Sequence, residues 1–204
     1  MRRRDFIAGL AGTTVGWTPT ARADDLPQKA VLREEDPGNS AGKSYVGTTV
    51  WRTEAWPGQA QKPNIAARAD VVIPAQNISI RWLLRRNDDK QLPASYIIEI
   101  VFTLPPDFPH GGISNVPGML TKQGETMHGE ALSAVAVKIG TTNSFLIGLP
   151  SADAEIERNV KLLLEASWFE IPMVYGDGKH AIIAVEIGTP GERSLSDAIG
   201  HARL

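Results

Sequence analysis

The sequence predicts a mainly β protein, a β-sandwich of about nine strands with two peripheral helices in the C-terminal half. Two observations lead to this fold class. Apolar and polar residues alternate with a period of two over several long segments, which places one face of each segment on a core. Two later segments instead carry apolar residues at helical spacing, and each begins with residues that are typical of helix N-termini.

The strands follow in order from the alternation. The clearest signals cover residues 78–84, 96–102 and 181–187, and weaker signals lie at 30–34, 45–53, 66–73, 132–139, 144–149 and 168–175. A Gly-Asp-Gly sequence after Tyr175 predicts a hairpin turn between the last two strands. Trp82 and Ile100 fall on the apolar side of their segments, so we expect both in the core.

Two helices are expected between and after the late strands. The first follows Ser151, a candidate N-cap, and its apolar stripe consists of Ile156, Val160, Leu163 and Leu164. The second begins near Thr189, where Pro190 and Glu192 complete the pattern of a capping box with proline at the first helical position.

The N-terminus predicts export. Residues 1–23 read as a signal peptide, with Arg3, Arg4 and Phe6 in a twin-arginine pattern and with Ala21 and Ala23 at a small-x-small cleavage site. A general secretory leader is the alternative. Residues 24–29 are predicted to be a flexible segment, and residues 30–204 a single sandwich domain. A periplasmic or secreted location follows from this interpretation.

Composition excludes several classes of function. The chain has no cysteine, which excludes disulfides, thiolate metal sites and a cysteine nucleophile. Its formal net charge is −2 and it has no basic cluster outside the leader, so nucleic acid is not an expected partner. No later apolar run is long enough to span a membrane. Residues 38–44 resemble a phosphate-binding loop, but Pro37 stands where that motif needs its first glycine, so we expect no nucleotide. No cofactor is predicted.

The segment from Leu104 to Met119 is the most unusual stretch, with four prolines and three glycines. Prolines remove backbone donors, so the segment cannot be an interior strand. It nevertheless carries apolar side chains, and two interpretations are open. It is either a stiff connection that caps an open end of the sandwich or a binding loop. The candidate ligand-binding residues are Phe108, His110, Ile113, Val116 and Met119.

These features favour a non-enzymatic binding or accessory protein of the cell envelope, with an envelope protein, a peptide or a glycan as its partner. The alternative is a periplasmic enzyme, such as a metal-assisted hydrolase that uses loop residues 107–128. Its candidate side chains are Asp107, His110, Glu125 and His128. No serine-nucleophile motif and no closely spaced histidine pair supports an enzyme, so no catalytic or metal-binding residue is assigned.

Three segments carry a resemblance to known proteins: FTLPPDFPHGGISNVPG at 102–118, VWRTE at 50–54 and WFEIPMVY at 168–175. Together they resemble a group of uncharacterised exported bacterial proteins. More distantly, the C-terminal half is similar to the invasion-associated locus B family of periplasmic all-β proteins. The pattern that carries this similarity in the present chain is a strand that ends in leucine and proline, then a helix, a hairpin of two strands and a small helix over 188–199. The resemblance implies an exported β protein and transfers no catalytic residue. Members of that family typically contain cysteines, which this chain lacks.

Overall fold

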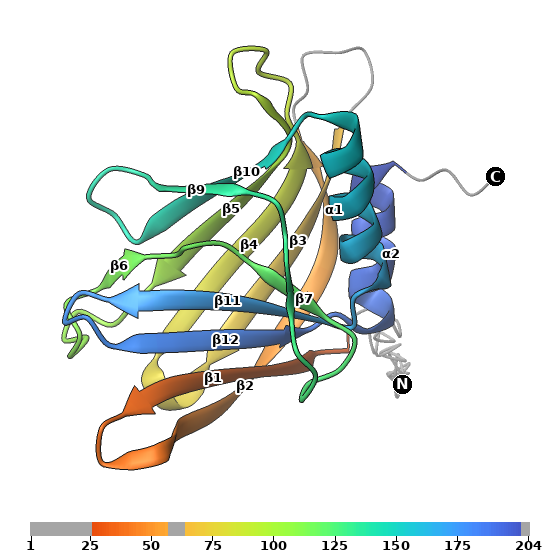
Figure 1. The fold of residues 1–204 in the computed structure, drawn as a ribbon. Helices are drawn as coiled ribbons and strands as arrows, with labels where there is room; N and C mark the ends of the chain where they lie inside the picture. Colours follow the sequence, from red (N-terminus) through yellow and green to blue (C-terminus); the bar gives the residue numbers. More distant parts are fainter. Residues whose placement is uncertain (1–25, 57–63, 201–204) are drawn as a thin grey trace, which may run out of the picture.

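The computed structural model describes residues 26–56 and 64–200, so the predicted signal peptide lies outside the described residues. The described chain is mainly β, as predicted, with its two α-helices in the C-terminal half (Figure 1). The strands are β1 (Gln28–Asp36), β2 (Asn39–Trp56), β3 (Asn64–Ile73), β4 (Ile78–Arg86), β5 (Ala94–Thr103), β6 (Ile113–Asn115), β7 (Leu120–Lys122), β8 (Glu130–Ala131), β9 (Val135–Lys138), β10 (Ser144–Pro150), β11 (Trp168–Tyr175) and β12 (His180–Glu186).

The expected sandwich of two sheets is wrong, because the twelve strands form one curled sheet (Figure 1). Its order is β8-β7-β11-β12-β1-β2-β3-β4-β5-β10-β9, and β6 pairs with β11 beside this path. Each of the four strands from β1 to β4 pairs antiparallel with the next one along the chain, so β1 to β5 form one continuous meander within a single layer. The twist of long neighbouring strands then curls the sheet until its inner face encloses the core.

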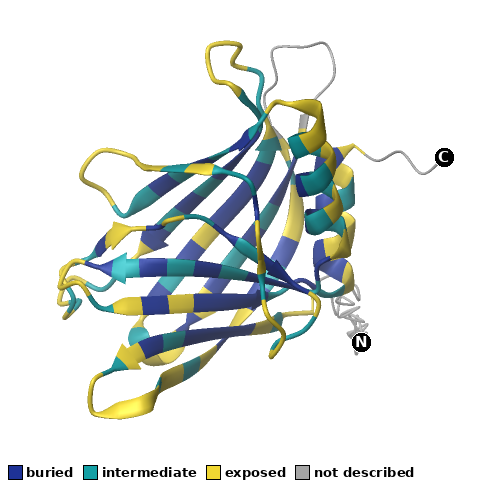
Figure 2. Cartoon of the chain, viewed as in Figure 1, coloured by how far each residue is buried: buried dark blue, intermediate teal, exposed yellow. Residues whose placement is uncertain are grey.

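The core is the inner face of this curl. Trp82 lies beside Trp51 and Phe169, with ring centroids 5.4 and 5.3 Å apart. Both indole nitrogens have partners: Trp51 Nε1 donates to the carbonyl of Glu186 at 2.9 Å, and Trp82 Nε1 lies 3.2 Å from the sulfur of Met119. Figure 2 shows the resulting alternation of buried and exposed residues along the strands. The middle of the curl is therefore filled by aromatic side chains.

The two helices lie together at one end of the curled sheet, which we call the helix end (Figure 1). They are α1 (Asp153–Glu165) and α2 (Gly188–Ile199), and a short 3-10 helix, η2 (Pro74–Gln76), joins β3 to β4. Neither predicted side-chain cap forms: the N-cap residues are Ala152 and Ile187. Helix α2 packs on β2, β3 and β4. A Cβ on Gly191 would stand 3.0 Å from the Trp51 ring, so this close approach requires glycine.

Candidate functional site

The predicted binding loop lies at the opposite end of the sheet, which we call the loop end, where residues 104–112 meet the 176–179 hairpin turn. Of its candidate residues, Ile113, Val116 and Met119 are at most 2% exposed and belong to the core. Phe108 packs against the core and is only partly buried. The segment thus caps the open end of the curl with apolar side chains, which explains why a proline-rich connection carries them. Phe108 and His110 are the two candidates that reach the surface.

His110 is the centre of a cluster of rings at the loop end. Its imidazole stacks on Tyr175, with ring centroids 4.7 Å apart and an interplanar angle of 5°. Phe108 stands edge-on to both rings, with its centroid 5.4 Å from each. His110 Nδ1 lies 2.7 Å from Asp177 Oδ2 in the hairpin turn. This hydrogen bond with His110 lowers the pKa of the Asp177 carboxyl.

Tyr175 connects this cluster to the carboxylates at the end of β1. Its hydroxyl donates to Glu34 Oε1 at 2.6 Å, and burial, followed by this hydrogen bond, raises the pKa of the Tyr175 hydroxyl. A cavity of about 270 Å³ lies beside it, and Glu35 and Asp36 are among its lining residues. Both already accept backbone hydrogen bonds, Glu35 from His180 and Asp36 from Gly38. The carboxylates therefore hold the strand ends in place.

The structure does not bring together the residues of the enzyme alternative. Glu125 lies beside basic side chains of β1, with Oε2 2.8 Å from Lys29 Nζ and Oε1 3.4 Å from Arg33. Asp107 and His128 are exposed. Within residues 26–56 and 64–200, no group of three His, Cys, Asp or Glu side chains is arranged to hold a metal ion. In the described chain, His110 and Asp177 form a pair with a catalytic geometry, because a carboxylate on Nδ1 orients an imidazole for proton transfer at Nε2.

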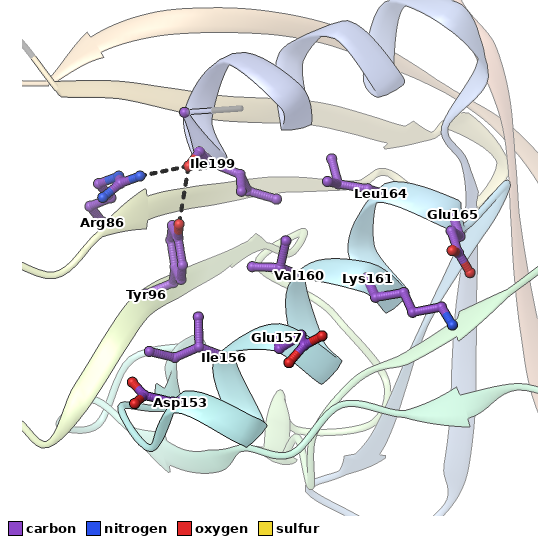
Figure 3. A pocket seen from close by; sticks show the side chains of 11 residues that line it. Arg86, Tyr96, Asp153, Ile156, Glu157, Val160, Lys161, Leu164, Glu165 and Ile199 are labelled. Carbon is purple, nitrogen blue, oxygen red and sulfur yellow. Dashed lines mark hydrogen bonds between the residues drawn. The ribbon is translucent and has the colours of Figure 1, made fainter. Parts of the chain in front are cut away.

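A larger cavity lies at the helix end, where the sequence analysis predicts no site. It is a groove of about 620 Å³ between α1, β5 and the end of α2 (Figure 3). Three residues of the predicted apolar stripe of α1 form the floor of this groove. Leu163 is fully buried, whereas Ile156, Val160 and Leu164 are only partly buried and line the groove together with Tyr96 and Ile199.

One wall of the groove is held by hydrogen bonds to the last turn of α2. The carbonyl of Ile199 accepts from the Tyr96 hydroxyl at 3.1 Å and from Arg86 Nη2 at 2.7 Å, as the dashed lines in Figure 3 show. The final carbonyls of a helix lack partners within the helix and carry partial negative charge, so a guanidinium there is stabilising. The Arg86 guanidinium carbon also lies 5.6 Å from the centre of the Tyr96 ring. These contacts preform the groove.

The rim of the groove is charged while its floor is apolar. Asp153, Glu157 and Glu165 stand on α1 around the apolar stripe, and Lys161 is the basic residue among them. Arg86 adds a second positive charge beside the end of α2, so three carboxylates face two basic side chains. The rim therefore has an excess of negative charge. An apolar floor with polar groups at its edge is the usual composition of a small-ligand or peptide site.

Fold and groove together define a mainly β protein with a filled, curled sheet and a helix-lined apolar groove at one end. Comparisons with protein-family models, with curated proteins and with solved structures find no match to the chain. In the part of the chain that the structure describes, no helix combines the length and the apolar character needed to cross a membrane.

Proposed function

We propose that this chain is an exported, non-enzymatic binding or accessory protein of the cell envelope, and that its ligand site is the groove at the helix end. The observation that carries the proposal is the incomplete burial of Ile156, Val160 and Leu164 on the inner stripe of α1. An amphipathic helix in a folded domain normally buries this stripe. The remaining apolar area is available to a ligand, at about 25 cal/mol per Å² removed from water.

Two properties of the groove support ligand binding. Its volume of about 620 Å³ lies within the range of roughly 300–1,000 Å³ that is common for ligand pockets. Its wall is fixed by Tyr96 and Arg86 through Ile199, so a ligand would not have to order it. Preorganisation of this kind reduces the entropic cost of association.

The lining favours an apolar peptide segment over a glycan. The floor is mostly aliphatic, and its single ring, that of Tyr96, uses its hydroxyl on Ile199. Sugar recognition needs free hydrogen-bonding groups, which this floor lacks. The acidic side chains on the rim favour basic residues beside the apolar segment. We therefore propose an apolar, basic-flanked segment of an envelope protein as the ligand.

Binding of the neutral apolar dye N-phenyl-1-naphthylamine tests the site. The wild-type protein should enhance its fluorescence saturably. Val160→Glu places a charge on the apolar floor and should weaken binding at least about tenfold, which corresponds to about 1.4 kcal/mol. Val72→Glu is the matched control, because Val72 is 43% exposed on β3 and lies outside the groove. Circular dichroism establishes that both variants are folded.

Competition then tests the class of ligand. A short apolar peptide flanked by lysines should displace the dye, and the same peptide flanked by glutamates should displace it less well. Equal dye binding by wild type and Val160→Glu, or no saturable binding by the wild type, contradicts the proposed site. Equal displacement by both peptides leaves the site in place and refutes the charge preference.

One observation favours the enzyme alternative, namely the His110–Asp177 pair at the loop end. A hydrolase that used this pair would cleave a chromogenic ester such as p-nitrophenyl acetate and lose that activity in His110→Gln. We prefer the binding protein, because the metal-assisted mechanism needs additional ligands and Glu125 is instead paired with Lys29.

A further inference from the structure

Strand β9 forms one edge of the curled sheet and pairs only with β10 in the described chain (Figure 1). The amide of Ile139 donates to the carbonyl of Ser144 at 2.8 Å, so these two residues form a hydrogen-bonded antiparallel pair. Hydrogen-bonded and non-hydrogen-bonded pairs alternate along such a ladder. The backbone groups of Ala136 and Lys138 therefore point away from β10, where the sheet has no further strand.

The outer face of this edge is a row of apolar side chains. Val135, Val137 and Ile139 are 68%, 52% and 46% exposed, and Leu146 on β10 lies opposite Val137. Edge strands of soluble proteins usually carry charges or prolines that prevent pairing with another chain. This row has neither. It combines free backbone groups with apolar area, as strands that add to another sheet do.

The one charged residue of β9, Lys138, lies on the inner face of the strand and not in the apolar row. Ala136 packs against the core. Lys138 Nζ donates to the carbonyl of Ile113 at 2.6 Å and lies 5.8 Å from the centre of the Phe145 ring. The lysine is thus tied to the inner face, and the outer row stays uncharged.

We propose that the β9 edge pairs with the β9 edge of a second copy of this chain, antiparallel and with the two-fold axis at Val137. In this register Ala136 and Lys138 form hydrogen-bonded pairs with Lys138 and Ala136 of the other copy. Val137 faces Val137, and Val135 faces Ile139, in the closer non-hydrogen-bonded pairs. Every member of the apolar row then meets another member of the row.

The two neighbouring registers are less favourable, so the two copies should pair with the two-fold axis at Val137. An axis at Lys138 would place two lysines directly opposite each other, and like charges in that position are destabilising. An axis at Ala136 would place Ile139 opposite Ser133. The Val137 register avoids both, and it closes as a two-fold pair. The contact involves five residues from each copy, against about 20–30 in a standard interface, so the dimer is weak and reversible.

Disulfide trapping tests the register, since the chain has no cysteine of its own. In the proposed pair the two Cα atoms at position 137 are about 4.5 Å apart, within the range that a disulfide bridges. Purified Val137→Cys treated with diamide should form covalent dimer at least about ten times faster than a variant whose thiols meet only by collision. Val46→Cys is that control, because Val46 is 67% exposed on β2.

Val135→Cys is the control for register. Val135 is 68% exposed on the same row, but the two copies of position 135 would lie about 13 Å apart. It should cross-link no faster than Val46→Cys. Trapping of Val137→Cys at the rate of Val46→Cys, or of Val135→Cys at the rate of Val137→Cys, overturns the proposal.

Sedimentation velocity provides a second measurement that needs no cysteine. The wild-type protein should show a sedimentation coefficient that rises with concentration, and Val137→Lys should abolish the rise by placing two charges at the two-fold axis. Its melting temperature should stay unchanged, because Val137 is half-exposed. A wild type that stays monomeric at every concentration, or a Val137→Lys variant that still dimerises, refutes the self-pairing. This test is independent of the groove at the helix end.

Discussion

The hydroxyl of Tyr175 donates a 2.6 Å hydrogen bond to Glu34 Oε1 and so joins β11 to β1 across the intervening strand β12. Both side chains are nearly inaccessible, at 1% and 9% exposed. Tyr175→Phe removes the donor and leaves a buried carboxylate with fewer partners, which should cost about 1–3 kcal/mol of unfolding free energy. Urea denaturation measures the loss. Tyr45→Phe is the control, because Tyr45 is partly buried and its hydroxyl makes no hydrogen bond to another described residue. If Tyr175→Phe is as stable as the wild-type protein, the hydrogen bond between Tyr175 and Glu34 contributes nothing to stability.

The His110–Asp177 hydrogen bond predicts a dependence of stability on pH. It lowers the pKa of Asp177 in the folded protein, so its stabilisation is complete above the ordinary aspartate pKa of about 3.9 and is lost as pH falls through the folded value. Wild type should therefore lose more stability than Asp177→Asn between neutral pH and about pH 3. Urea midpoints across that range give the comparison. Parallel curves for the two proteins would contradict the account.

Ile100 tests the assignment of the inner face. It lies directly opposite Trp82 on the neighbouring strand, and both are buried, as the sequence predicted. Ile100→Ala should destabilise the protein by about 2–5 kcal/mol, because it leaves a cavity in the aromatic core. Val101→Ala, one residue on and on the outer face, should cost much less. Chemical denaturation of both variants provides the measurement. A loss of unfolding free energy below about 1 kcal/mol for Ile100→Ala would contradict the assignment of Ile100 to the core-facing side of β5.

Export remains a prediction from the sequence, because residues 1–25 lie outside the described structure. The twin-arginine pattern predicts that replacing Arg3 and Arg4 by lysines blocks export, and the Ala-x-Ala site predicts a mature chain that begins at Asp24. Cell fractionation and intact mass of the periplasmic protein test the two statements. Normal export of the lysine variant would favour a general secretory leader instead.

The longer strands were predictable because alternation is a local signal. Each of the nine segments predicted as strands overlaps a strand of the structure, although the segment 132–139 is a strand only at Val135–Lys138. Trp82 and Ile100 are buried as expected. The short strands β6, β7 and β8 have only two or three residues each, too few to show a period. The single curled sheet depends on which strands pair, and that is a property of the whole chain. Local patterns therefore gave the elements but favoured the wrong arrangement.

The candidate site was harder to predict for a related reason. The loop from Leu104 to Met119 is unusual in composition, but its sequence does not distinguish a cap from a binding surface, because burial of Val116 depends on the sheet around it. The groove is built from β5, α1 and the end of α2, and contacts such as Tyr96 with Ile199 join residues far apart in the chain. The apolar stripe of α1 was visible in the sequence, but its incomplete burial was not.

The most direct test of the central claim is a methyl NMR titration of the protein with N-phenyl-1-naphthylamine. Ligand binding in the groove should shift the methyl signals of Ile156, Val160, Leu164 and Ile199, which line it. The signals of Ile113 and Val116 at the loop end should stay in place, because those side chains are buried under the cap. Shifts confined to the first group are the result we predict. Shifts at the loop end, or none at all in the groove, would contradict the assignment of the helix-end groove as the binding site.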